Sequence, residues 1–464
     1  MILFYFLVSM MPFADPPLLH YLAGDATFKL LGALCAVYAV LYLGQRKVFP
    51  SYFATWQSRF IVLFYLIAVL SSFTKGLAPI RESPIVSCTS YIILFFVTLT
   101  VVDSLNRLRW VLLSAAAALA FGSIFVIREW ITFRNVYSDF RPGWSVGDSN
   151  YFASAAILVV PFVYLRLRSG EFRWEKRFCA GALLIAAVAL TLCASRGGFL
   201  GLMAAFLVVL WRSRRRLRNL VLIGLLVLVP TLGLSNSPIR RLLRPTMSDR
   251  QSSENRIAAW TAGWRMIKAH PVAGVGLGNF KELMPRYADP GVRSDNIGHN
   301  SYVEVAAEMG ISQLLIFVGI LFFSYRSFEQ TRQKVQDSGP KLLYEAALGL
   351  EAGLIGHAVG ALTLSAEYQK LFWLVLCLSM CLPALARQVV PADERRTVRA
   401  RGLLSWRRGR QPTIGGSWKT RPVNQSLISG GALSGTSDKR PRTRREPAGS
   451  GVDSTPRFLQ KARR

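Results

Sequence analysis

Long blocks of consecutive apolar residues are the feature that most constrains how this 464-residue chain can fold. A helix needs about 20 apolar residues to cross the hydrocarbon core of a bilayer. Hydrophobic residues make up 52% of the chain and charged residues only 18%, whereas soluble proteins average about 25% charged residues. The sequence therefore predicts an all-α, polytopic integral membrane protein, and it excludes a soluble enzyme, a secreted scaffold and a disordered chain.

Twelve apolar blocks predict about 12 transmembrane helices. The first block is short for a complete span. An even number of spans places both termini on one side of the membrane. The blocks lie near residues 1–14, 27–44, 60–74, 85–102, 109–127, 151–167, 179–195, 197–211, 219–235, 302–324, 343–365 and 368–387.

The net charge of +30 follows this topology and does not indicate a nucleic-acid partner. Connections on the side of the termini, taken together with Arg109 and Arg166 at the adjoining block ends, carry 19 Lys and Arg against 5 acidic residues. The chain from Arg387 onward carries 19 against 5. Positive charge accumulates on the cytoplasmic side of membrane proteins. Both termini are therefore expected in the cytoplasm. The basic tail either only retains that orientation or also binds anionic membrane lipids.

The chain divides into a transmembrane domain at 1–388, which includes a long periplasmic loop at 236–300, and a tail at 389–464. The tail is rich in Gly, Ser, Pro and Arg, so we expect a basic, disordered cytoplasmic segment. Six cysteines lie in or beside apolar blocks without metal-ligand spacing, and the sequence has no phosphate-binding loop. We therefore expect no metal, no cofactor and no nucleotide hydrolysis.

The loop at 236–300 carries ten Lys and Arg against five acidic residues. This excess of positive charge lies on the face where topology does not favour it, so it indicates a site for an anion. Long loops escape the charge rule, and an ordinary solvated loop is therefore the alternative.

Within that loop, residues 254–269 have the pattern of an amphipathic helix. Helical steps of 100° place Arg256 in the apolar arc beside Trp260, whereas Arg265 falls on the polar face and is a secondary candidate. An arginine on a buried face needs an anionic partner. We expect Arg256 to bind either a phosphate, which suits the guanidinium fork, or a carboxylate of the bundle.

A second arginine lies in the Ser195-Arg-Gly-Gly198 turn between two predicted spans. The glycines permit a sharp reversal, but a turn alone does not require Arg196. Two rigid helices would hold this side chain at the outer membrane surface, where it could bind a lipid-linked phosphate. Snorkelling of the arginine toward the interface is the alternative.

The loop ends at His299 and Asn300, and Ser301-x-x-Glu304 then fits a capping box for the next helix. A histidine beside a helix N-terminus is favoured in its neutral form, which a general base requires. A hydrogen-bonded structural histidine is the alternative. Asn300 and Glu308 are secondary candidates, whereas Glu351, His357 and Glu367, in or beside a predicted span, could equally form an internal pair.

Taken together, these residues resemble the O-antigen ligase family and its polysaccharide-polymerase relatives. The similarity runs from about residue 145 to 325, and the predicted span count and long loop agree with it. Five stretches carry it: Gly147-Asp-Ser-Asn-Tyr-Phe-Ala153, Ser195-Arg-Gly-Gly198, Arg256-x-x-x-Trp260, His270-Pro-Val-Ala-Gly-Val-Gly-Leu-Gly-Asn-Phe280 and His299-Asn-Ser-Tyr-Val-Glu-Val-Ala-Ala-Glu-Met-Gly310.

The resemblance implies a metal-independent, inverting glycosyltransferase of the bacterial inner membrane. Such an enzyme moves a glycan from an undecaprenyl-pyrophosphate carrier to a glycan, lipid or protein hydroxyl at the periplasmic face. By this resemblance His299 activates the acceptor, and Arg196 and Arg256 bind the donor pyrophosphate. The ligase signature continues with a glycine and then an aromatic residue or threonine, where this chain has Gln313 and Leu314. This departure leaves the fold assignment intact, and the sequence does not separate ligase activity from polymerase activity.

Two functions of other classes remain open from the sequence. A transporter or exporter of lipid-linked glycans would show repeated halves and broken, charged spans, which we do not find. A non-catalytic component of an exopolysaccharide assembly complex would tolerate the combined loss of Arg196, Arg256 and His299.

Overall fold

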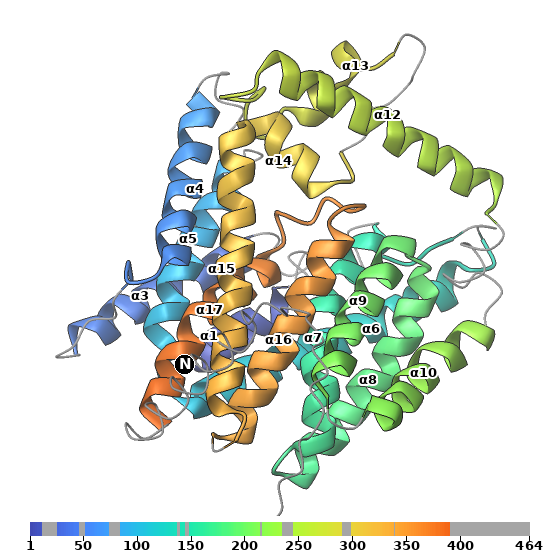
Figure 1. The fold of residues 1–464 in the computed structure, drawn as a ribbon. Helices are drawn as coiled ribbons and strands as arrows, with labels where there is room; N and C mark the ends of the chain where they lie inside the picture. The colour runs from blue at the N-terminus through green and yellow to red at the C-terminus, as the bar shows by residue number, and fades with distance from the viewer. Residues whose placement is uncertain are drawn as a thin grey trace, which may run out of the picture. The chain divides into compact units, whose positions relative to one another are not determined.

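The computed structural model describes residues 1–11, 26–45, 52–73, 84–136, 140–143, 148–213, 216–233, 245–289, 298–337 and 339–389. Within these ranges the chain forms helices and no strand, which confirms the all-helical prediction (Figure 1). The helices are α1 (Ile2–Met10), α3 (Ala26–Gly44), α4 (Trp56–Phe73), α5 (Pro84–Val101), α6 (Leu105–Phe133), α7 (Ser149–Ser169), α8 (Arg173–Cys193), α9 (Arg196–Arg212), α10 (Arg216–Gly233), α12 (Met247–Ala269), α13 (Phe280–Tyr287), α14 (Ser301–Met309), α15 (Ile311–Val335), α16 (Lys341–Gly360) and α17 (Lys370–Val389).

Six of the described helices are long and apolar enough to cross a membrane, namely α6, α7, α8, α15, α16 and α17. Shorter apolar helices lie at Lys29–Gly44, Trp56–Ser72 and Ile85–Val101. Helix α1 has nine residues, which is less than half of the length that a span needs. The chain is therefore an integral membrane protein, while the number of twelve spans and the orientation stay predictions. The predicted tail lies outside the described residues from position 390 onward.

The span predicted at 302–324 is wrong as a single element, because it consists of the separate helices α14 and α15. Gly310 lies between them with a φ of +88°, and a Cβ there would lie 2.0 Å from the carbonyl oxygen of Val272. Only glycine fits this position. The break allows α14 to pack beside α12 and α13, at the end of α4 and α15 (Figure 1).

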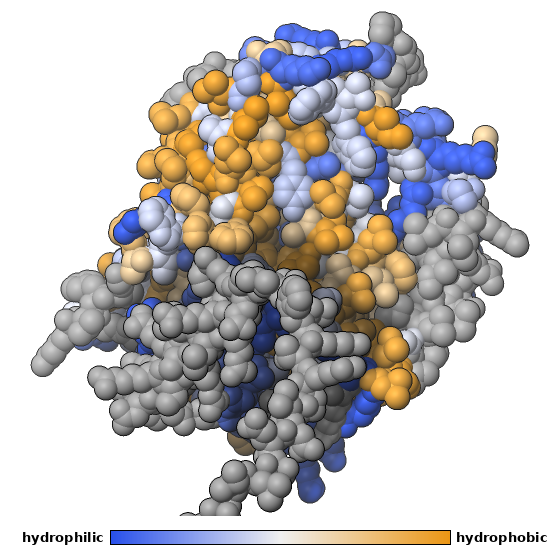
Figure 2. Space-filling view, in the orientation of Figure 1, coloured by the Kyte–Doolittle hydropathy of each residue, from blue (hydrophilic) through white to orange (hydrophobic). Residues whose placement is uncertain are grey.

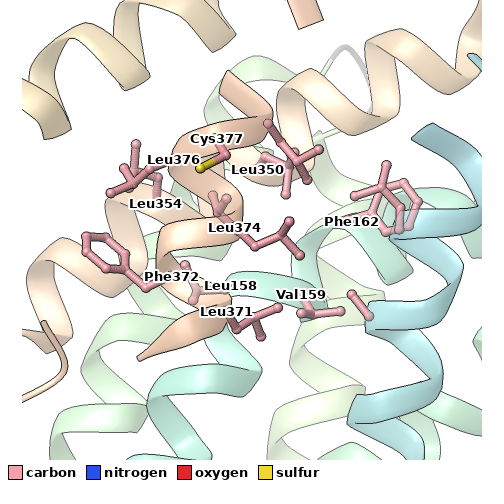
Figure 3. Close-up of a cluster of buried hydrophobic side chains, with 14 of the residues drawn as sticks. Leu158, Val159, Phe162, Leu350, Leu354, Leu371, Phe372, Leu374, Leu376 and Cys377 are labelled. Carbon is pink, nitrogen blue, oxygen red and sulfur yellow. The ribbon is translucent and has the colours of Figure 1, made fainter. Parts of the chain in front are cut away.

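The bundle core forms where α7, α16 and α17 meet (Figure 3). Leu158, Phe162, Leu350 and Leu374 are buried there among other aliphatic side chains. On another side of α16, a Cβ at Gly356 would lie 2.5 Å from the carbonyl oxygen of Gly201 in α9. Glycine thus lets the two helix backbones touch, as is common between helices in membranes.

Buried ion pairs join the bundle helices. Arg166 of α7 is fully buried, and it pairs with Glu175 of α8 at 2.5 Å and with Glu345 of α16 at 2.9 Å. Removing one partner from such a network would leave a buried charge uncompensated. Arg166 thus connects α7 with both neighbouring helices.

The ionisable residues predicted within the eleventh span do not pair with each other. Glu351 pairs with Arg332 at 2.7 Å and with Arg212 at 3.4 Å. The Nδ1 atom of His357 lies instead 3.2 Å from the Ser154 hydroxyl. Both residues therefore connect helices within the bundle.

The surface of the described helices separates by hydropathy (Figure 2). Hydrophobic residues gather over α4 and α15, where Leu66, Leu70, Leu315 and Phe322 are exposed. Hydrophilic residues gather over α12 and α13. The first region suits contact with lipid tails and the second suits contact with water.

Candidate functional site

The segment between α10 and α14 folds against the bundle and has an apolar core of its own. Ala262, Met266, Phe280 and Met284 are buried in this core with Ala307 of α14. The described part of this segment is therefore a packed unit, in contrast to the ordinary solvated loop considered from the sequence.

Helix α12 begins earlier than the sequence pattern predicts. It starts at Met247, where the Thr246 side chain accepts a hydrogen bond from the backbone of Asp249 and the Asp249 side chain accepts one in return. Polar residues in the first two turns hid this capping box from the hydrophobic periodicity. The extra turns bring α12 into contact with Arg196.

Arg196 is the first residue of α9, and its side chain is 20% exposed. Its Nη2 atom lies 3.4 Å from the Asp249 carbonyl oxygen, 3.3 Å from the Ser253 hydroxyl and 3.9 Å from the Asp249 carboxylate. Ser253 and Arg256 are three positions apart on α12 and are therefore neighbours on its surface. These contacts bring the two candidate phosphate-binding arginines to the same part of α12.

Arg256 lies on the face of α12 that turns inward. Ala259, Gly263 and Ile267 share this face and are buried, while Arg256 itself is half-buried. Its positive charge acts on His299, whose pKa it lowers. The hydrogen bond from Trp260, one turn after Arg256, to the Gly298 carbonyl oxygen brings this part of α12 next to the residue that precedes His299.

His299 lies directly before α14, and its backbone has a φ of +46°. Asn300 caps this helix, because its side-chain oxygen accepts hydrogen bonds from the backbone of Tyr302 and Val303. The predicted capping box at Ser301 is therefore wrong. The Ser301 hydroxyl donates instead to the carbonyl oxygen of Leu364 at 2.9 Å.

The pKa of His299 lies below its ordinary value of 6.5. Burial is the main cause, since it disfavours the charged imidazolium, and the positive charge of Arg256 adds to it. The negative charge of Asp148 acts in the opposite direction. His299 is therefore neutral near pH 7 and can accept a proton.

The N-terminus of α7 adds polar groups to the same end of the structure. Asp148 caps α7 by accepting a hydrogen bond from the Asn150 backbone at 2.8 Å. The side-chain oxygen of Asn150 accepts hydrogen bonds from Ser195 at 2.7 Å and from Arg141 at 3.3 Å. Arg141 was not singled out from the sequence, because a lone arginine in a loop carries no periodic signal.

Two non-glycine residues of this region have a left-handed backbone conformation. Among the described residues other than glycine, only Ala194 and His299 have positive φ values, of +49° and +46°. Ala194 ends α8 two positions before Arg196. Such strain persists only where the surrounding structure enforces it, and it gathers at functional sites.

Two of the secondary candidates have partners outside this group. Arg265 is 43% exposed and pairs with Asp289 at 2.6 Å. Glu308 accepts hydrogen bonds from the backbone of Phe280 at 3.2 Å and from the Tyr368 hydroxyl at 2.7 Å. Both residues therefore have structural partners that explain their presence.

The described ranges hold no group of three His, Cys, Asp or Glu side chains that could bind a metal ion. The six cysteines are all free and buried. Metal independence stays a prediction.

Part of the chain matches a known protein family. Residues 181–318 match the family model described as O-Antigen ligase. The matched region extends from α8 into α15 and includes Arg196, Arg256 and His299. A search of curated proteins found no match.

Proposed function

We propose that this chain, which belongs to the O-antigen ligase-related superfamily, transfers a glycan from an undecaprenyl-pyrophosphate carrier to an acceptor hydroxyl at the periplasmic face of the bacterial inner membrane. The family match itself indicates glycan transfer of the ligase or polymerase type. The setting of His299 is the observation that supports the more specific proposal. This residue lies directly before the Asn300 cap of α14, and the adjacent Gly298 carbonyl oxygen accepts a hydrogen bond from Trp260 of α12. Burial and the positive charge of Arg256, on the same helix as Trp260, lower the pKa of the imidazole.

His299 would accept the proton of the acceptor hydroxyl as that oxygen attacks the anomeric carbon of the donor sugar. A positioned general base accelerates such a step by about 10²–10⁴-fold. The bond between the anomeric carbon and the pyrophosphate oxygen breaks as the new glycosidic bond forms. This single displacement would invert the anomeric centre.

Arg196 and Arg256 would stabilise the negative charge that develops on the departing lipid pyrophosphate. Fixed cations in a partly buried site are effective because they need no reorganisation during the reaction. The contacts of Arg196 with Asp249 and Ser253 orient its guanidinium before the donor binds. The reaction as proposed requires no metal ion and no cofactor.

Analysis of glycans from cells tests this proposal. A deletion strain would be complemented with the wild type, His299→Ala or His270→Ala. His270 is a matched control, because it lies in the same segment and is exposed beside the Tyr287 hydroxyl. We expect only His299→Ala to lose finished surface polysaccharide. Normal surface polysaccharide with that variant would contradict the proposal.

The lipid-linked intermediate that accumulates with His299→Ala identifies the acceptor. Long lipid-linked chains would mean that the enzyme is a ligase, which attaches finished chains to a lipid or protein. Single repeat units would mean that it is a polymerase, whose acceptor is another glycan.

A further inference from the structure

The side chain of Trp260 joins α12 to the loop that carries His299. Trp260 lies one turn after Arg256, and its indole Nε1 donates a hydrogen bond to the Gly298 carbonyl oxygen at 2.9 Å. That oxygen belongs to the peptide group directly before His299. The same helix therefore presents Arg256 and fixes the backbone next to the proposed base.

A second hydrogen bond fixes the backbone of Gly298. The Glu304 carboxylate accepts hydrogen bonds from the Gly298 backbone and from the Ser365 hydroxyl. After His299, the chain enters the Asn300 cap of α14. The backbone is thus fixed both before and after the histidine.

This attachment matters because His299 has a conformation that a side chain disfavours. A non-glycine residue in the left-handed region costs about as much free energy as one hydrogen bond contributes. Without a neighbouring constraint, the peptide before His299 would relax to an ordinary conformation. The imidazole would then point in another direction.

We infer that Trp260 is a positioning residue for His299, whose indole N–H holds the Gly298 peptide and thereby directs the imidazole toward the acceptor hydroxyl. This inference rests on the proposed function, because Trp260 acts only through the base. The inferred role belongs to the indole N–H group of Trp260. The aromatic ring has a separate possible role, which is to pack against a sugar.

Trp260→Phe removes the N–H donor and keeps an aromatic ring. Membranes of the deletion strain carrying each variant would receive increasing amounts of extracted undecaprenyl-pyrophosphate glycan, and kcat and KM for transfer would be measured. We expect a decrease of about tenfold in kcat, the size of one hydrogen bond, with little change in KM. Trp264→Phe is the matched control, because Trp264 lies one turn further on α12 and is 57% exposed.

The pH dependence distinguishes positioning from a general loss of structure. A released imidazole is less buried, so its pKa rises and activity with Trp260→Phe falls at a higher pH than in the wild type. The double variant Trp260→Phe/His299→Ala should be as active as His299→Ala alone. Wild-type kcat with Trp260→Phe, or a lower kcat with an unchanged pH profile, would overturn the inference.

The two hypotheses fail separately. Full activity of His299→Ala would overturn the proposed function and the role of Trp260 together. An inactive His299→Ala with a fully active Trp260→Phe would overturn the role of Trp260 alone.

Discussion

The guanidinium of Arg196 lies 3.9 Å from the carboxylate of Asp249, the residue that completes the capping box of α12. One carboxylate therefore both begins α12 and contacts the first residue of α9. The contact connects the Ser195–Gly198 turn to the helix that presents Arg256, although Arg196 and Arg256 are far apart in the sequence.

Replacement of Arg256 or Arg265 in α12 by lysine tests the phosphate contact. Arg256→Lys keeps the charge but loses the guanidinium fork, so we expect transfer to decrease by about 10-fold or more. Arg265→Lys should leave transfer within about twofold, because an exposed ion pair contributes little. Initial rates with a series of donor concentrations would measure the effect of each substitution on transfer. Equal effects of the two substitutions would contradict a bidentate phosphate contact at Arg256.

The lowered pKa of His299 predicts the pH dependence of transfer. The neutral imidazole is the active form, so activity should decrease on acidification with a midpoint below 6.5, the pKa of an ordinary histidine. Arg256→Gln removes a charge that lowers this pKa, and the decrease should then begin at higher pH. The rate at saturating donor, measured as a function of pH, checks both statements. An acid limb that does not move with Arg256→Gln would argue against their electrostatic contact.

The strained backbone at Ala194 predicts an unusual response to glycine. Ala194→Gly removes a buried methyl group but relieves the left-handed conformation. Ala186→Gly removes a buried methyl group from the middle of α8 without any such relief. We expect Ala194→Gly to be more stable than Ala186→Gly by about 1–2 kcal/mol. Thermal unfolding of the detergent-solubilised variants measures this difference, and equal losses of stability would show that Ala194 is not strained.

Labelling of single cysteines tests the predicted orientation. Arg286 of α13 and Arg216 of α10 are exposed positions, and the six native cysteines are buried. A membrane-impermeant thiol reagent added outside the inner membrane should label Arg286→Cys and not Arg216→Cys. The reverse pattern would place the candidate site in the cytoplasm, where the proposed reaction has no access to periplasmic acceptors.

The sequence predicted the helices and the inward face of Arg256 because both depend on local periodicity. It missed the start of α12, where a capping box precedes the apolar repeat. It also assigned the cap of α14 to Ser301, although Asn300 fulfils that role. Both residue types are good caps, and the choice depends on a contact between Ser301 and Leu364 that is distant in the sequence.

Sequence analysis could not predict the partners of charged and polar side chains, because these partners are also distant in the sequence. Arg196 contacts a residue 53 positions away, and Trp260 contacts one 38 positions away. Such pairs depend on how the helices pack. The break at Gly310 is similar, since the close approach of Val272 becomes evident only in the folded chain.

Transfer by purified protein tests the central claim most directly. The wild type and His299→Ala would be reconstituted in lipid vesicles with radiolabelled undecaprenyl-pyrophosphate glycan and an acceptor extract from the deletion strain, and product would be followed over one turnover. We predict that His299→Ala binds the donor as the wild type does and forms product at least about 100-fold more slowly. Product formation at the wild-type rate would contradict a catalytic role for His299.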